Sequence, residues 1–172
     1  MKDKKLFILL FIIMLFSIGF TMLTIIFCLD NNLKHKNDIW DIHFENLNVL
    51  EGSVSGENIV KMPTISNNNL IEYSVILEKP GDYYEFEVVV INDGTLDAEL
   101  SVIPTIKGIS EKQDKYINYI VTYSNGTQIN ATDKLLSNRT VTYKVRVFYE
   151  SSSLSYEEQR LNLVFSVNYS QI

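Results

Sequence analysis

The sequence predicts an all-β protein, an antiparallel β-sandwich of the immunoglobulin-like or jelly-roll-like type with seven to nine strands, preceded by one N-terminal transmembrane helix. Three observations lead to this prediction. Apolar and polar residues alternate with a period of two in several runs, which is typical of strands with one face in a core. Turn-forming residues separate the runs. Beyond the leading apolar segment, no helical pattern exceeds about two turns, which disfavours an α/β fold.

The leading apolar segment, residues 6–29, contains no charged residue. Its 24 residues would form a helix of about 36 Å, which exceeds the roughly 30 Å hydrocarbon core of a bilayer. Lys2, Lys4 and Lys5 precede the segment, so the positive-inside rule places the N-terminus in the cytoplasm and the rest outside. We expect a retained signal-anchor bound to the lipid bilayer. The alternative is a signal peptide cleaved after the small residues Ser17 and Gly19, with a secreted product.

Four parts follow from this reading of the chain. They are a basic cytoplasmic tail (1–5), the transmembrane helix (6–29), a polar tether (30–38) and an extracytoplasmic β-sandwich domain (39–172). Cys28 is the only cysteine, so the exterior domain has no disulfide and depends on packing. The residues from Asn31 onward carry 19 acidic and 12 basic side chains, a net charge of −7. Nucleic acid is therefore an unexpected partner, because phosphate binding needs the opposite sign.

The first predicted strand starts at Ile39. Trp40, Ile42 and Phe44 alternate, and Leu47 and Val49 continue in the opposite phase, which a bulge at residues 45–46 would reconcile. Residues 51–58 form a predicted loop, and residues 59–69, which include a proline, have no clear pattern and are expected to cross the domain. The next strand has an apolar face composed of Ile71, Tyr73, Val75 and Leu77.

The central stretch, residues 78–100, contains two turns around an alternating strand. Proline and glycine favour the first turn at Pro80, Gly81 and Asp82. Residues that tolerate left-handed backbone form the second, at Asn92, Asp93 and Gly94, and the stretch is predicted to be a β-hairpin. The apolar face of its first strand consists of Tyr84, Phe86, Val88 and Val90. Leu100, Val102 and Ile106 resume the alternation.

The remaining elements follow the same logic. Ser110 and Gln113 form a predicted capping box for one or two helical turns at 111–116, before an alternating strand at 117–123. Asn125-Gly126 is a strong hairpin signal, with a return strand expected at 127–129. Two long strands at 141–149 and 161–169 complete the sandwich.

Two segments resemble known surface proteins. The turns at 80–82 and 92–94, with Ala98, resemble the PGD…N-x-G pattern of bacterial immunoglobulin-like surface domains. The segments KPGDYYEFEVVVINDGTLDAEL and LNLVFSVNYSQI resemble the camelysin/TasA family of Gram-positive exported matrix proteins. The resemblance implies a jelly-roll-like sandwich, export behind an apolar segment and, in some members, polymerisation into biofilm fibres. It also raises the alternative of a membrane-bound metallopeptidase of camelysin type.

Candidate chemical sites are few. The two histidines, His35 and His43, occur outside any H-E-x-x-H motif, which disfavours catalytic zinc. Asp93, Asp97 and Glu99 are weak calcium candidates, because an acidic exterior suits a hard cation. No serine lies in a G-x-S-x-G motif and no glycine-rich phosphate loop is present. We therefore expect no catalytic residue and no cofactor.

These observations favour a non-enzymatic cell-surface module with a structural, adhesive or assembly role. Its expected partners are other surface or matrix proteins, or copies of itself, because exposed strand edges offer unpaired backbone donors and acceptors.

Overall fold

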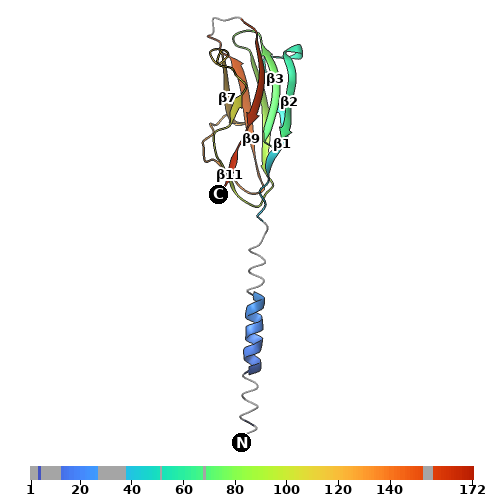
Figure 1. Ribbon diagram of the computed structural model, residues 1–172, viewed down its shortest axis with the longest axis vertical. Coiled ribbons are helices and arrows are strands. Elements are labelled where there is room, and N and C mark those ends of the chain that lie inside the picture. Colours follow the sequence, from blue (N-terminus) through green and yellow to red (C-terminus); the bar gives the residue numbers. More distant parts are fainter. Residues whose placement is uncertain (1–3, 5–12, 27–37, 51, 68, 153–156) are drawn as a thin grey trace. The chain divides into compact units, whose positions relative to one another are not determined.

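The computed structural model describes residues 4, 13–26, 38–50, 52–67, 69–152 and 157–172 (Figure 1). The chain divides into two compact units, Met1–Asp38 and Ile39–Ile172. The first unit contains a helix at residues 13–26 whose hydroxyl side chains bond back to the helix carbonyls. Thus Ser17 Oγ donates to Met14 O (2.8 Å) and Thr21 Oγ1 to Ile18 O (2.8 Å). Among the described residues, no helix has the length and apolarity needed to cross a membrane. The rest of the predicted span, 6–12 and 27–29, and the tether residues 30–37 lie outside the described residues.

The second unit is built of β-strands, as predicted. Seven of the strands that the structure describes have seven to eleven residues: β1 (Ile42–Val49), β2 (Ile59–Asn67), β3 (Leu70–Leu77), β4 (Tyr83–Asn92), β7 (Ile117–Tyr123), β9 (Arg139–Tyr149) and β10 (Gln159–Ser166). Four more have two or three: β5 (Ala98–Leu100), β6 (Thr105–Lys107), β8 (Lys134–Leu135) and β11 (Tyr169–Gln171). A short 3₁₀ turn, η1 (Gly56–Asn58), precedes β2. The described part of the chain thus has eleven strands rather than seven to nine, because the short ones carry too little pattern to be recognised.

The strands form antiparallel sheets with non-consecutive neighbours. One four-stranded sheet has the order β1-β4-β9-β7 and the other β2-β3-β10-β6, and a small sheet has the order β11-β5-β8. In Figure 1 the long strands run side by side along the sandwich. The antiparallel β-sandwich is therefore confirmed, while consecutive strands such as β3 and β4 belong to different sheets.

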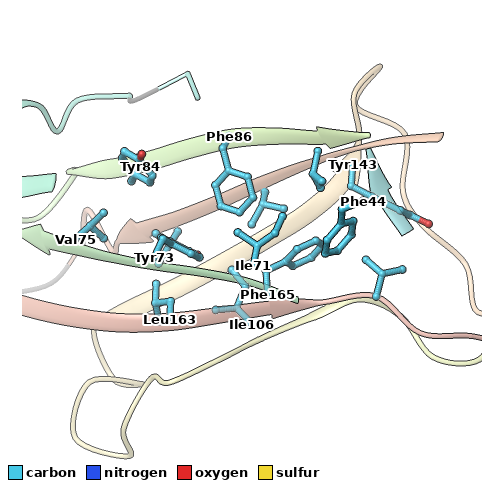
Figure 2. Close-up of a cluster of buried hydrophobic side chains, with 14 of the residues drawn as sticks. Phe44, Ile71, Tyr73, Val75, Tyr84, Phe86, Ile106, Tyr143, Leu163 and Phe165 are labelled. Carbon is cyan, nitrogen blue, oxygen red and sulfur yellow. The ribbon is translucent and has the colours of Figure 1, made fainter. Parts of the chain in front are cut away.

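An aromatic core joins the two four-stranded sheets (Figure 2). The Phe86 ring of β4 packs edge-on against Tyr73 of β3 with centroids 5.1 Å apart, and against Phe165 of β10 at 6.2 Å. Phe44 of β1 stacks on Phe165 at 6.0 Å. Such pairs stabilise a core by about 0.5–1.5 kcal/mol beyond the burial of their surface. The sandwich is therefore held together by rings that alternate between its two layers.

The predicted apolar faces are confirmed at most positions. All four core residues of β3, and those of β4, are at most 1% exposed. The predicted bulge in the first strand is also confirmed, because the pairing of β1 with β4 shifts register between Phe44 and Asn46. Trp40 is an exception, since it precedes β1 and is 44% exposed. The unpatterned segment around Pro63 proves to be β2, an edge strand whose register against β3 shifts three times. An edge position accommodates proline, which lacks an N–H.

The turn at Pro80, Gly81 and Asp82 connects the two sheets. The Asp82 carboxylate accepts hydrogen bonds from the backbone N–H groups of Glu78 (3.0 Å) and Lys79 (3.1 Å). Gly81 has φ +93°, a conformation that favours glycine. Tyr149 N donates to Asp82 O (2.8 Å), which fastens the turn to the end of β9.

The prediction of a hairpin at Asn92, Asp93 and Gly94 is wrong. β4 pairs with β1 and β9, whereas β5 belongs to the small sheet. The fully buried Asn92 side chain explains the difference, because Nδ2 donates to Leu96 O (2.8 Å) and Leu135 O (3.1 Å) while Oδ1 accepts from Gly94 N (3.1 Å). The buried Asn92 side chain thus links the end of β4 to β8 by hydrogen bonds, and it is not an exposed turn residue.

We predict that Asn92→Ala lowers the free energy of unfolding of a 39–172 fragment by about 2–4 kcal/mol, because Leu96 O and Leu135 O lose their donor and Gly94 N keeps only its longer bond to Asp41 O (3.3 Å). Urea unfolding measures the effect. Asn125→Ala is the matched control, since Asn125 also accepts a backbone hydrogen bond (Thr127 N, 3.0 Å) but is exposed. Its loss should stay below about 1 kcal/mol. Equal losses for the two variants would contradict the prediction.

Candidate functional site

The acidic residues suggested for calcium do not form a ligand set. Asp97 Oδ1 accepts a hydrogen bond from Ser137 N (2.9 Å), Asp93 N donates to Asp41 O (2.9 Å), and Glu99 O accepts from Ser170 Oγ (3.5 Å). Across the part of the chain that the structure describes, no three His, Cys, Asp or Glu side chains are grouped to hold a metal ion. The calcium hypothesis gains no support from this geometry.

The zinc hypothesis also gains no support from the described residues. His43 Nδ1 of β1 lies 2.8 Å from Asp41 Oδ1 in a partly exposed pair, with no third ligand beside it in the described chain. His35 lies outside the described residues. The camelysin-type metallopeptidase thus remains a prediction without a described metal centre.

A cluster of tyrosines lies at one end of the domain. Tyr143 and Tyr169 share a hydrogen bond between their hydroxyls (2.6 Å), and Tyr123 donates to Asp133 Oδ2 (2.6 Å) while its ring stacks on Tyr143 at 5.5 Å. Burial raises the pKa of Tyr143, and of Tyr169 to about 12. The hydrogen bond from Tyr123 lowers the pKa of Asp133. A groove of about 650 Å³ beside Tyr123 also contains the exposed cations Lys134 and Arg139.

The sheet edges provide the clearest candidate for a functional surface. β1 has a bulge, β2 contains Pro63 and three register shifts, and β6 has only three residues. Such features hinder pairing with another chain. β7 is different, because its seven residues, INYIVTY, pair with β9 in unbroken register and include no charge, proline or glycine. β7 ends its sheet and lies at a margin of the sandwich (Figure 1).

Alternate residues of β7 direct their backbone groups away from β9. Glu150 N donates to Tyr116 O (2.7 Å) and Ser124 N to Thr142 O (2.9 Å), so even-numbered positions of this ladder form the hydrogen-bonded pairs. The odd-numbered residues therefore face the open edge. They are Ile117, Tyr119, Val121 and Tyr123.

The two ends of this open edge are closed by local turns. Ile117 N donates to Gln113 O (2.8 Å), and Tyr123 exchanges hydrogen bonds with the Asn125-Gly126 turn, donating to Thr127 O (3.0 Å) and accepting from Gly126 N (2.8 Å). Between them, the N–H and C=O of Tyr119 and Val121 form no hydrogen bond with any described residue. We call the backbone from Ile117 O to Val121 O the open window.

The return strand predicted to begin at 127–129 would have paired with the end of β7 beside the open window, and its absence has a local cause. Thr127 forms one contact with Tyr123, but Ile129 is buried in the core and 7% exposed. The chain therefore leaves β7 after the turn. The sequence signal for the window was Ile120, an uncharged apolar residue on the polar face of the alternation, and it is 50% exposed.

The side chains of β7 itself are uncharged, and the Glu150 carboxylate lies beside the window, 3.1 Å from Asn118 Nδ2. Two cations of β9, Lys144 and Arg146, face Thr122 and Ile120 across the ladder. Lys144 Nζ lies 2.9 Å from Glu85 Oε1, and Arg146 lies 3.9 Å from Glu85 Oε2 and 3.8 Å above the Tyr83 ring. Both cations are thus held toward β4, and the edge presents backbone and uncharged side chains.

Comparisons with known proteins do not assign the chain to a family. No protein-family model matches it, and no curated protein matches it either. Among solved structures, the chain is similar to the GAE domain of GGA2p from Saccharomyces cerevisiae, with 9% sequence identity, a TM-score of 0.31, and coverage of 65% of this chain and 90% of that chain. At that TM-score the likeness carries no argument about fold or function.

We predict that the domain loses stability as the pH rises above 10. The buried tyrosines ionise near their ordinary value of 10.0 in the unfolded chain but at higher pH in the folded one, Tyr169 at about 12. Their contribution is complete below pH 10 and disappears as the pH rises through the folded pKa. Melting temperatures of a 39–172 fragment from pH 7 to 12 measure this loss. Tyr169→Phe should reduce the decline above pH 10, and an unchanged decline would contradict the assignment.

Proposed function

We propose that this protein is a membrane-anchored cell-surface β-sandwich with a structural, adhesive or assembly role, acting by binding rather than catalysis. The observation that carries the proposal is the open window on β7. An uncharged, regular strand edge with free backbone donors and acceptors can add a strand from another chain. The resemblance to camelysin/TasA matrix proteins supports a surface or biofilm-matrix setting.

The anchor in this proposal is the apolar segment 6–29, with the exterior domain outside the cell. Two features support it. The segment has no charged residue, and the hydroxyls of Ser17, Thr21 and Thr24 donate to carbonyls three or four residues earlier in the helix. Such bonds satisfy polar groups where water is absent. A retained anchor would hold the β-sandwich at the surface, whereas cleavage would release it into the medium.

N-terminal sequencing of protein from membranes and from medium tests the anchor. We expect the membrane fraction to hold the main product and its sequence to begin at Met1 or Lys2, because the apolar run continues past Gly19. A main product in the medium that begins near residue 20 would replace the anchored form with a secreted one.

We predict that blocking the window weakens adhesion of cells that display the full chain. Val121→Pro removes an N–H that points away from β9, a position where an edge strand accepts proline. Val121→Ala is the matched control, because it trims the same half-buried side chain and keeps the N–H. Each lost hydrogen bond should weaken attachment about fivefold. The measurement is the aggregated fraction of cells and the retained matrix, with folding checked by circular dichroism.

A second variant guards against misfolding of the first. Ile120→Lys places a charge on the half-exposed outer side of the edge and leaves the core intact. Adhesion unaffected by both variants would overturn the proposal. Stoichiometric zinc together with chelator-sensitive cleavage of a peptide by the full chain would instead establish the metallopeptidase alternative.

A further inference from the structure

We infer that the open window binds a second copy of itself, antiparallel, with the two-fold axis at Tyr119. This inference rests on the proposed function and names the partner of the same edge. Two copies related by a two-fold axis present the same surface to each other, so the surface must be complementary to itself. The window meets this requirement in charge, in hydrogen bonding and in shape.

Charge is the first requirement. β7 has no charged side chain, so two copies bring no like charges together at the new strand pair. Two cations of β9 face this strand and are held toward β4 by Glu85, and the Glu150 carboxylate accepts a hydrogen bond from Asn118 Nδ2 (3.1 Å). A second copy of the strand is itself uncharged and needs no charged partner on the edge.

Hydrogen bonding restricts the register. Only odd-numbered residues of β7 face the window, so odd residues must pair with odd residues of the second copy. With the axis at Tyr119, Tyr119 N donates to Tyr119 O of the second copy, and Val121 N donates to Ile117 O. Both bonds occur twice by symmetry, which gives four. Moving the axis to Asn118 leaves two, because the N–H of Ile117 already donates to Gln113 O.

The turn at the end of β7 excludes the other four-bond register. An axis at Ile120 would place Ile117 of the second copy opposite Tyr123. Thr127 already occupies that position, since its carbonyl accepts from Tyr123 N at 3.0 Å. With the axis at Tyr119, residue 115 of the second copy falls there instead, and that residue precedes the strand in a turn. With the axis at Tyr119 all four bonds are kept, and no β7 residue of the second copy lies opposite Tyr123.

The side chains that meet in this register are compatible. On the inner face Tyr119, which is 37% exposed, lies beside Tyr119 of the second copy. On the outer face Ile120 lies opposite Asn118 of the second copy, in a non-hydrogen-bonded pair with Cα atoms about 4.5 Å apart. Residues 120 of the two copies lie diagonally, about 7–8 Å apart. These distances make the register testable by disulfide formation, which requires Cα atoms about 4.4–6.8 Å apart.

The experiment uses the full chain in phosphatidylglycerol vesicles, with Cys28→Ser in every variant. Chains with Ile120→Cys and chains with Asn118→Cys carry tags of different size and are oxidised alone and together. We expect the mixed disulfide to exceed either self-linked product about tenfold, because the diagonal distance cannot be bridged without backbone movement. Val60→Cys, on β2 and 48% exposed against 50% for Ile120, measures the random background.

Each product identifies one register, and dominant self-linking of Asn118→Cys would place the axis at Asn118 and overturn the inferred register. A dominant mixed disulfide supports the inference. Dominant self-linking of Ile120→Cys places the axis at Ile120 and overturns the register, and no product above the Val60→Cys background overturns the second copy as partner. Loss of cell adhesion in Val121→Pro without any mixed disulfide would leave the proposed function in place with a different partner chain, so the two failures are distinguishable.

Discussion

The structure depends on the burial of aromatic rings between two sheets. The β-sandwich domain, residues 39–172, contains no cysteine, so no disulfide supports the fold. Tyr73, Phe86 and Phe165 are each at most 1% exposed and come from three strands in both layers. Full burial of such a side chain contributes about 1.5–3 kcal/mol, and one ring contacts rings on the facing sheet. These contacts fix the faces of the strands and therefore determine which side chains remain at the edges.

The sequence predicted features that depend on neighbouring residues, such as the alternation within a strand. It missed features that depend on residues far apart in the chain, such as which strands share a sheet. The period of two identified the core residues of β3 and β4 and the positions of β9 and β10, because alternation is a property of a single strand. Sheet membership is not. The Asn92 turn indicated a hairpin, yet one partner of its side chain is Leu135, 43 residues away. Pro63 hid β2 in the same way, since only the assembled sheet shows that its edge accepts a proline.

The candidate site combines both kinds of information. The composition of β7 and the Asn125-Gly126 turn could be recognised in the sequence. That the window stays open could not, because it follows from the burial of Ile129, which competes with pairing to β7. A buried isoleucine contributes about 1.5–3 kcal/mol, whereas each further backbone pair in an exposed hairpin contributes about 1 kcal/mol. The chain after the Asn125-Gly126 turn therefore packs into the core, and β7 has no paired strand on its open edge.

The size of the window determines the setting in which it can act. Four hydrogen bonds contribute about 2–6 kcal/mol in total, while association of two free chains costs an estimated 4–15 kcal/mol. Pairing through the window alone is therefore weak between molecules in dilute solution. Confinement in one membrane raises the effective concentration of the second copy and removes much of that cost. A neutral strand edge of this length is thus suited to a chain held at a surface, so the proposed pairing through β7 depends on the proposed anchor.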